Sequence, residues 1–413
     1  MDARGHQGES VVGGAGAAVN TPSVAGEQVA TRSDLQRLKA LFAASGIGVG
    51  SLMPYMVLYL TWRGLSPTEA GLVMALMAGI GVLAVPLWGL VADRALGTVT
   101  ALRLSSVISA LASLALLASG RYGPAIVVCA GLLAATRAPG EAFANTLAIS
   151  TLDKRASRDF GHIRLWASIG FAAAVAVSAV VLEHTSLALI LVAYPAAMVV
   201  QLASTGRHTW PVAPRAPMLR LSGLRAAPKS RLLLLHGGAL AFGIAMGASF
   251  TASPLRLVAV GGGVMAVGAA AVLGALAEIP FMRTSGDLWH RLGAGKFFLL
   301  GGLAFAASLA CFAVLADPVV LVGASVLRGA GYALVYVGLV TVASSQMPSG
   351  RQATGQALLQ ATMMGLGPLI GSSLGGFAYE YTSPAVLFGI SALTALVGVA
   401  LARAAAAPVP LDG

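Results

Sequence analysis

The chain has 413 residues, of which 57% are hydrophobic and only 10% are charged. A soluble domain carries about a quarter charged side chains, so this composition excludes an ordinary water-soluble protein and predicts lipid as the solvent. The formal net charge of +11 does not indicate a nucleic-acid-binding protein, because the basic residues lie in loops between apolar stretches. Cys129 and Cys311 lack the paired spacing of a metal or redox site.

A polar segment precedes the first apolar stretch. It lacks the basic start and apolar run of a secretory signal, so residues 1–35 are predicted to be a disordered cytoplasmic tail. A membrane-spanning helix needs about 20 mostly apolar residues. Twelve stretches of this kind follow, at residues 38–61, 68–92, 99–119, 123–150, 163–183, 186–205, 231–254, 257–282, 296–315, 319–343, 353–378 and 383–403.

A hydrophilic segment divides the twelve stretches into two sets of six. Residues 206–230 contain several arginines, four prolines and no acidic residue, which is typical of a linker. The sequence therefore predicts an all-α membrane protein with two six-helix bundles around a central cavity. The bundles cover residues 36–205 and 231–403, and residues 404–413 form a short cytoplasmic tail.

Basic residues are distributed unevenly between alternate loops. One set of loops holds only Arg63, Arg121 and Arg256. The other set holds the basic linker and Arg32, Arg37, Lys39, Arg94, Lys154, Arg155, Arg158, Arg283, Arg291 and Arg351. By the positive-inside rule, the second set is cytoplasmic. The sequence thus predicts a multi-pass protein of the cell membrane with both termini in the cytoplasm.

The two halves also resemble each other in sequence. The string Arg137-Ala-Pro-Gly140-Glu141-Ala142 in the fourth stretch has a counterpart, Arg328-Gly-Ala-Gly331-Tyr332-Ala333, in the tenth. Pro86 near the end of the second stretch likewise matches Pro280 near the end of the eighth. Transporters are commonly built from repeated halves that hold the substrate between them, so this repeat favours a transporter.

The string Gly89-Leu-Val-Ala-Asp93-Arg94 lies between the second and third stretches. It resembles the signature of the major facilitator superfamily, and the resemblance to that superfamily extends from about residue 40 to residue 403. The resemblance implies twelve helices in two pseudo-symmetric bundles and a cytoplasmic gate held by Asp93 and Arg94. Gly97 falls one position late, and the usual following basic pair is missing.

Two further patterns are similar to one branch of that superfamily. Gly161-His-Ile-Arg164-Leu-Trp166-Ala-Ser168-Ile-Gly170-Phe171 resembles the start of helix five in phenylpropionate permeases, lactose permease relatives and nucleoside:proton symporters. Glu278-Ile279-Pro280 is similar to a helix-eight pattern of the same branch, and both patterns imply proton symport. The Gly-Pro motif of drug/proton antiporters is absent from residues 172–181 but occurs at Gly367-Pro368, so efflux of a drug or natural product is the alternative.

Ionisable side chains inside apolar stretches are candidate functional groups, because a charge in the hydrocarbon layer is costly unless it is paired or hydrated. If a pseudo-twofold axis relates the halves, Arg137 and Arg328 face each other across the cavity. Two guanidiniums suit a carboxylate or phosphate, which favours an anionic substrate. The structural alternative is an ion pair of Arg137 with Glu141, or of Arg328 with Glu278 or Glu141.

Glu278 lies among apolar residues, where desolvation favours the protonated carboxylic acid. It is the first candidate to carry a coupled proton, and Glu141 is the second. Tyr332 takes the position of Glu141 in the repeat and is predicted, with Tyr55, to bind substrate. Charged side chains at cytoplasmic helix ends are predicted to form a gate, namely Asp93, Arg94, Arg164 and Arg291.

The sequence contains no complete phosphate-binding loop, HExxH helix, GxSxG elbow or metal-ligand cluster, so an enzyme is not indicated. It predicts a proton-coupled secondary transporter of a small organic solute, with an aromatic or carboxylate-bearing anion as the leading class. The expected partners are that solute, protons and the lipid bilayer, with no nucleic acid and no cofactor, in a monomer. A transporter-like sensor or scaffold is a further alternative.

Overall fold

The computed structural model describes residues 31–152, 157–206, 210, 229–347 and 352–406, and within these ranges every regular element is helical. The first half contains α1 (Arg32–Leu52), η1 (Met53–Tyr55), α2 (Met56–Trp62), α3 (Pro67–Val91), η2 (Ala92–Leu96), α4 (Thr98–Ala118), α5 (Gly123–Arg137), α6 (Pro139–Thr151), α7 (Ser157–Glu183), η3 (Leu187–Leu189) and α8 (Ile190–Thr205). The second half contains α9 (Lys229–Ala259), α10 (Gly263–Val314), α11 (Pro318–Gln346), α12 (Gln352–Gln360), η4 (Ala361–Leu366), α13 (Gly367–Tyr381) and α14 (Pro384–Ala406). Most of the predicted N-terminal tail, of the linker and of the C-terminal tail lies outside the described residues.

The described residues form eleven helical stretches that are long and apolar enough to cross a membrane. One of them, α10, has 52 residues, and its backbone leaves helical geometry at Gly293, with φ 69° and ψ 161°. A positive φ is accessible to glycine because it has no Cβ. Residues 263–292 and 294–314 are therefore two successive helices, and the predicted all-α fold with twelve spans is confirmed.

The boundary between the eighth and ninth spans differs from the predicted one. Hydropathy ends the eighth span at residue 282 and starts the ninth at residue 296, but the helix continues through Arg283 and Arg291 to residue 292. A hydropathy window locates the apolar part of a helix and not its hydrogen-bonded end. The helix of the eighth span therefore extends beyond its apolar part, and Gly293 sets its end.

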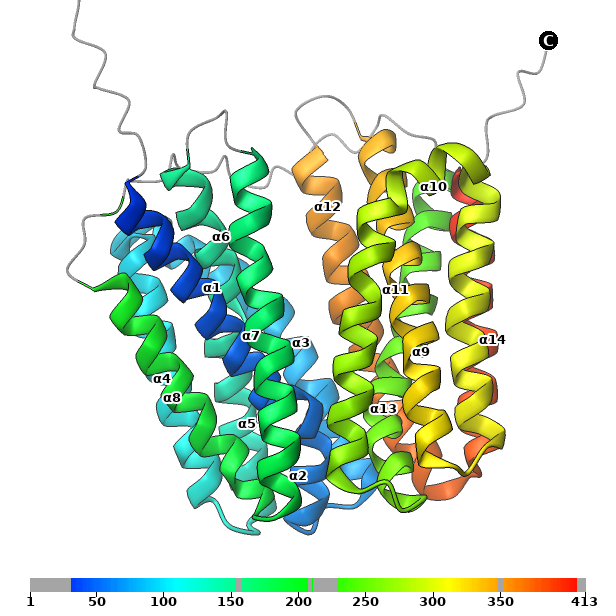
Figure 1. The fold of residues 1–413 in the computed structure, drawn as a ribbon, viewed down its shortest axis with the longest axis horizontal. Helices are drawn as coiled ribbons and strands as arrows, with labels where there is room; N and C mark the ends of the chain where they lie inside the picture. The colour runs from blue at the N-terminus through cyan, green and yellow to red at the C-terminus, as the bar shows by residue number, and fades with distance from the viewer. Residues whose placement is uncertain (1–30, 153–156, 207–209, 211–228, 348–351, 407–413) are drawn as a thin grey trace, which may run out of the picture.

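The two halves, residues 32–205 and 229–406, stand side by side (Figure 1). α1 begins and α14 ends at the same face of the molecule, as an even number of spans requires. The helices of the two halves diverge toward this face, which we call the open face. The halves meet near the other face, where α3 packs on α13 and α10 packs on α7. We call this the closed face.

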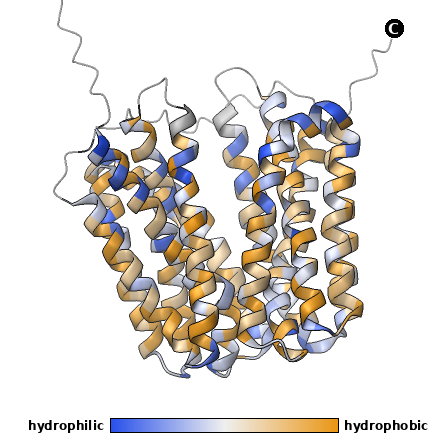
Figure 2. Ribbon diagram, in the orientation of Figure 1, coloured by the Kyte–Doolittle hydropathy of each residue, from blue (hydrophilic) through white to orange (hydrophobic). Residues whose placement is uncertain are grey.

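Hydrophobic residues predominate along the helices of both bundles, and hydrophilic residues gather toward the helix ends (Figure 2). Val128, Leu233, Val314 and Val319 are 70% to 77% exposed. Soluble monomers rarely expose large continuous apolar surfaces. This surface therefore suits contact with lipid tails and supports the assignment of the helices as membrane spans.

Close backbone contacts hold the helices within each half. Gly46 and Gly50 of α1 lie against the backbone of α7, and Gly371 of α13 lies against the Ile244 carbonyl of α9, with no room for a Cβ at any of the three glycines. Lipid tails are as apolar as leucine, so helices in a membrane associate through such packing and through hydrogen bonds. Each half is therefore a tightly packed bundle with its own contacts.

Candidate functional site

Two adjoining cavities lie between the halves. The first has a volume of about 420 Å³ and is lined by the N-terminal half and by residues 275–282 of α10. The second has a volume of about 440 Å³, lies mainly among α9, α10, α11 and α13, and also includes Met53 and Met74 of the N-terminal half. Arg137, Phe171 and Glu278 line both cavities. Volumes of this size suit a small organic molecule.

Arg328 of α11 is the most deeply buried charge that lines either cavity. Only 8% of this residue is exposed, and its Nη1 donates a hydrogen bond to the Ser253 hydroxyl at 2.8 Å. Its guanidinium carbon lies 5.5 Å from the ring centroid of Phe250 and 5.4 Å from that of Phe312, both within cation–π range. The described residues place no carboxylate in an ion pair with Arg328, so the structural alternative of a pair with Glu278 or Glu141 is not observed among them.

Arg137 ends α5 and Pro139 begins α6, with only Ala138 between them. Pro139 has no backbone N–H to donate, so the helical hydrogen bonding of the fourth span is interrupted beside this arginine, while Ala138 keeps helical angles of φ −54° and ψ −40°. The Nε atom of Arg137 is buried and has no hydrogen-bond partner among the described residues. Arg137 and Arg328 both line the second cavity. The structure thus brings together the two arginines that the repeat relates.

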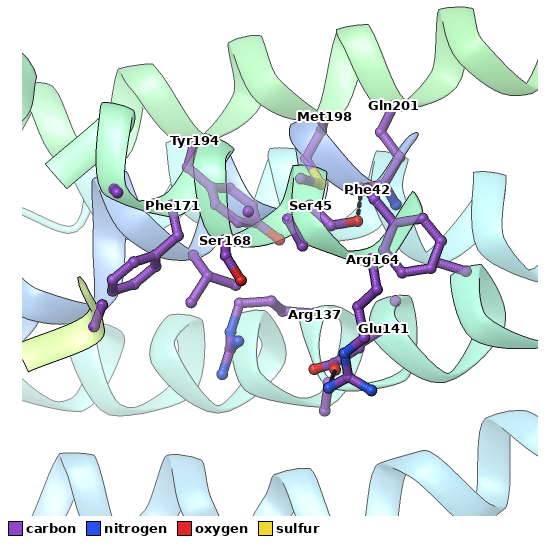
Figure 3. A pocket seen from close by; sticks show the side chains of 18 of the residues that line it. Phe42, Ser45, Arg137, Glu141, Arg164, Ser168, Phe171, Tyr194, Met198 and Gln201 are labelled. Atoms are coloured by element: carbon purple, nitrogen blue, oxygen red, sulfur yellow. Dashed lines mark hydrogen bonds and ion pairs between the residues drawn. The ribbon is translucent and has the colours of Figure 1, made fainter. Parts of the chain in front are cut away.

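Glu141 pairs with Arg164 of α7, with Oε1 and Nη2 3.1 Å apart (Figure 3). Both side chains are more than half exposed, at 68% for Glu141 and 55% for Arg164, and both line the first cavity. The structural alternative, an ion pair of Arg137 with Glu141, is therefore not observed among the described residues, and Glu141 instead joins α6 to α7. Arg164, which the sequence predicts to be a gate residue, therefore forms its ion pair on the wall of the first cavity.

Glu278 lies in α10 at the junction of the two cavities. It follows the buried Ala277 and is itself half-buried, and Pro280 two residues later removes a backbone donor. No ion pair or hydrogen bond of its carboxyl group occurs among the described residues. A carboxyl group in this position can exchange a proton with either cavity.

The two predicted substrate-binding tyrosines have different surroundings. Tyr332 lines the second cavity, and its ring stacks on that of Tyr336 with centroids 5.7 Å apart. Tyr55 is fully buried and its hydroxyl donates a hydrogen bond to the Val175 carbonyl of α7 at 2.8 Å. It lines neither cavity, because its hydroxyl lies in the packing between α7 and α10, beside Gly268.

The other predicted gate residues lie near the open face. Asp93 and Arg94 occupy the π-helical turn η2, and Arg291 precedes the break at Gly293. All three are exposed, and none forms an ion pair within the part of the chain that the structure describes. The structure does not join them into a gate, which agrees with halves that diverge at this face.

Sequence reasoning missed a chain of hydrogen bonds along the first cavity. Ser45 Oγ donates to Gln201 Oε1 at 3.2 Å (Figure 3). Gln201 Nε2 in turn donates to Ser106 Oγ at 3.0 Å. Nearby, the Tyr194 hydroxyl donates to Ser109 Oγ at 3.1 Å. The serines at helical spacing in the third apolar stretch could have indicated these hydrogen bonds. Together these polar side chains give the N-terminal half a neutral polar wall.

Comparison with known proteins identifies the family. Residues 37–390 match the MFS_1 like family. The chain is 29% identical to the maltose permease of Geobacillus stearothermophilus over 356 residues, which covers 85% of this chain and 89% of the permease. It is also 22% identical to the uncharacterized transporter YwbF of Bacillus subtilis, with 88% of this chain and 91% of YwbF covered.

Solved structures show the same fold. A point mutant of the nucleoside transporter NupG superposes with a TM-score of 0.79 at 18% identity, covering 90% of this chain and 99% of NupG. An auto-inhibited peptide transporter of the POT family superposes with a TM-score of 0.74 at 14% identity, covering 90% and 96% of the two chains. The chain therefore belongs to the MFS_1 like family of the major facilitator superfamily, and it is a multi-pass membrane protein that transports a small solute and is not an enzyme.

Proposed function

We propose that this transporter couples the movement of a small organic acid to that of a proton. The observation that carries this proposal is the buried guanidinium of Arg328, which lines the second cavity without a carboxylate partner among the described residues. Burying an unpaired charge is costly. A substrate carboxylate supplies the missing countercharge, and a guanidinium can bind it through two parallel hydrogen bonds.

The position of Glu278 supports the coupling. When Glu278 is protonated, Arg137 and Arg328 leave a net positive charge at the junction of the cavities, which favours binding of an anion. When Glu278 loses its proton, its carboxylate competes with the substrate for the same positive field and favours release. Binding of the proton and binding of the substrate therefore support each other.

The distribution of basic residues supports an orientation. Arg32, Arg94 and Arg291 lie near the open face, whereas Arg63 and Arg256 lie near the closed face. The positive-inside rule then makes the open face cytoplasmic. In this orientation both termini lie in the cytoplasm, and the cavities are reached from inside the cell.

A neutral, hydroxyl-bearing solute is the second candidate substrate. The specific observation in its favour is the polar wall of Ser45, Ser106 and Gln201, because hydroxyl and amide groups can exchange hydrogen bonds with a polyol. The maltose permease and the nucleoside transporter among the similar proteins carry names of such solutes. A neutral solute brings no charge that could pair with the buried Arg328 guanidinium, so this candidate ranks second.

Uptake into proteoliposomes distinguishes the two candidates. The purified protein is reconstituted and offered labelled 3-phenylpropionate, lactate, maltose and uridine, each with and without an imposed pH gradient. We expect accumulation of an acid that depends on the gradient and exceeds accumulation in protein-free vesicles. Accumulation of maltose or uridine with neither acid transported would replace the first candidate with the second.

A further inference from the structure

Two carboxylates at the closed face contact the opposite half of the molecule. Glu183, the last residue of α7, accepts a hydrogen bond on Oε2 from the Met265 amide of α10 at 3.0 Å. Glu380 of α13 accepts one on Oε2 from the Thr68 amide of α3 at 2.9 Å. Each contact joins a helix end in one half to a helix start in the other.

These contacts satisfy backbone donors that a helix start leaves free. The N-cap residue of α10 is Gly262, which has no side chain to accept a hydrogen bond, so Glu183 provides the missing cap from the other half. α3 has its own cap, because Ser66 Oγ accepts from the Glu69 amide, and Glu380 takes the neighbouring amide of Thr68. A carboxylate also interacts favourably with the positive end of the helix dipole.

The two contacts are repeats of one another. Glu183-His184-Thr185-Ser186 and Glu380-Tyr381-Thr382-Ser383 share the pattern Glu-x-Thr-Ser. In both segments the threonine hydroxyl donates to the carbonyl four residues earlier, at 2.5 Å and 2.6 Å, and the serine hydroxyl accepts an amide of the next helix. Equivalent residues of the two halves therefore make reciprocal contacts.

Small residues let the helices approach closely enough for these contacts. A Cβ on Gly71 of α3 would lie 2.5 Å from the Ser372 carbonyl oxygen of α13, and a Cβ on Gly268 of α10 would collide with Ala179 of α7. At Gly263, where φ is 62°, a Cβ would lie 2.9 Å from Glu183 Oε1. The missing Cβ of Gly263 thus leaves room for the Glu183 carboxylate at the start of α10, and the close approach of α3 to α13 brings Glu380 to the start of α3.

We propose that Glu183 and Glu380 are positioning residues that hold the closed face shut and set the balance between the two orientations of the transport cycle. Both contacts cross between the halves, so both must break when this face opens. The carboxylates and the amides then hydrogen-bond to water instead. This inference does not depend on the identity of the substrate or on proton coupling.

Distance measurement by spin labelling tests the proposal without a substrate. Cys129 and Cys311 are replaced by alanine, and labels are attached through Tyr122→Cys and Val386→Cys, two exposed positions near the closed face in opposite halves. We expect Glu183→Gln and Glu380→Gln each to increase the population of molecules whose closed face has opened, seen as a longer distance between the labels. The ratio of this population to that with the face shut should rise about threefold to tenfold, as for loss of a charged contact at a helix N-terminus. The double variant should multiply the two effects.

Asp317→Asn is the matched control. Asp317 also caps a helix at the closed face, but it accepts from the Val319 and Val320 amides of its own half, at 2.8 Å and 3.1 Å. The Asp317→Asn variant should leave the distribution of distances between the two labels unchanged. An unchanged distribution in the folded double variant, or an equal shift in the control, would overturn the proposal. If the double variant does not purify as a monodisperse species, the two single variants decide in the same way.

Discussion

The two halves of this transporter share one helical plan but present different walls to the cavities between them. In the N-terminal half, Ser45, Gln201 and Ser106 satisfy one another through hydrogen bonds. In the C-terminal half, Arg328 lies between two phenylalanine rings and donates a hydrogen bond to the Ser253 hydroxyl. Repeated halves thus preserve helix positions while the side chains that meet the substrate diverge. The C-terminal half therefore holds the most deeply buried charge that a bound anion would neutralise.

The largest effect is expected from Arg328→Gln, which removes the buried charge from the C-terminal wall. Loss of a charged hydrogen bond at a buried site costs about 3 kcal/mol, or roughly 100-fold in the kcat/KM of acid uptake. Arg137→Gln should lower the kcat/KM of acid uptake roughly tenfold, because it removes only one charge-assisted contact at a less buried site. Initial rates of acid uptake into proteoliposomes measure both effects. Arg403→Gln, a change at an exposed arginine outside the two central cavities, is the control. Normal uptake by Arg328→Gln would eliminate the anion site, and a larger loss in Arg137→Gln would reverse the comparison.

Glu278→Gln tests the residue that both cavities share. Glutamine resembles the protonated glutamic acid but cannot release a proton, so accumulation driven by a pH gradient should fall to the level measured without a gradient. Exchange of labelled for unlabelled substrate across the membrane should continue, because exchange needs no net proton movement. Gradient-driven accumulation equal to that of the unsubstituted protein would reject Glu278 as the proton carrier.

A smaller effect is expected from Glu141→Gln in the N-terminal half. An exposed ion pair contributes about 0.2 to 1 kcal/mol, so uptake should fall by no more than roughly fivefold. The exchanged pair, Glu141→Arg with Arg164→Glu, should restore part of the loss if the pair acts through its mutual attraction. A loss as large as that of Arg328→Gln would instead place Glu141 in substrate binding or proton transfer.

The smallest effects separate the two tyrosines. Tyr332→Phe should raise the KM for substrate by about twofold to threefold, as for loss of one neutral hydrogen bond. Tyr55→Phe should leave uptake unchanged and lower thermal stability modestly, because it removes the buried bond to the Val175 carbonyl, worth about 1 kcal/mol. Uptake and thermal unfolding of the two variants, measured side by side, check the assignment. A transport defect in Tyr55→Phe with normal stability would restore Tyr55 to the site.

Hydropathy located most spans correctly, but it misjudged several local features. The eighth span continues as a helix to Gly293, and Pro139 interrupts the helical hydrogen bonding of the fourth span just after Arg137. Such changes depend on single residues, a glycine with a positive φ in one case and a proline without an N–H in the other, which an average over about 20 residues does not register. The roles of Arg137, Arg328, Glu278 and the gate residues are still predictions, although the structure places the first three at the cavities.

The sequence by itself determined that the chain lies in a membrane, crosses it in twelve helices and repeats its first half in its second. These properties follow from composition and spacing, because lipid cannot solvate a backbone or a charge and its thickness sets the helix length. Only the tertiary structure decided that Glu141 meets Arg164, that Tyr55 faces the packing and that Glu183 and Glu380 reach the opposite half. Those contacts join residues distant in sequence, and they depend on how each helix is tilted and rotated against its neighbours, which packing sets and hydropathy does not.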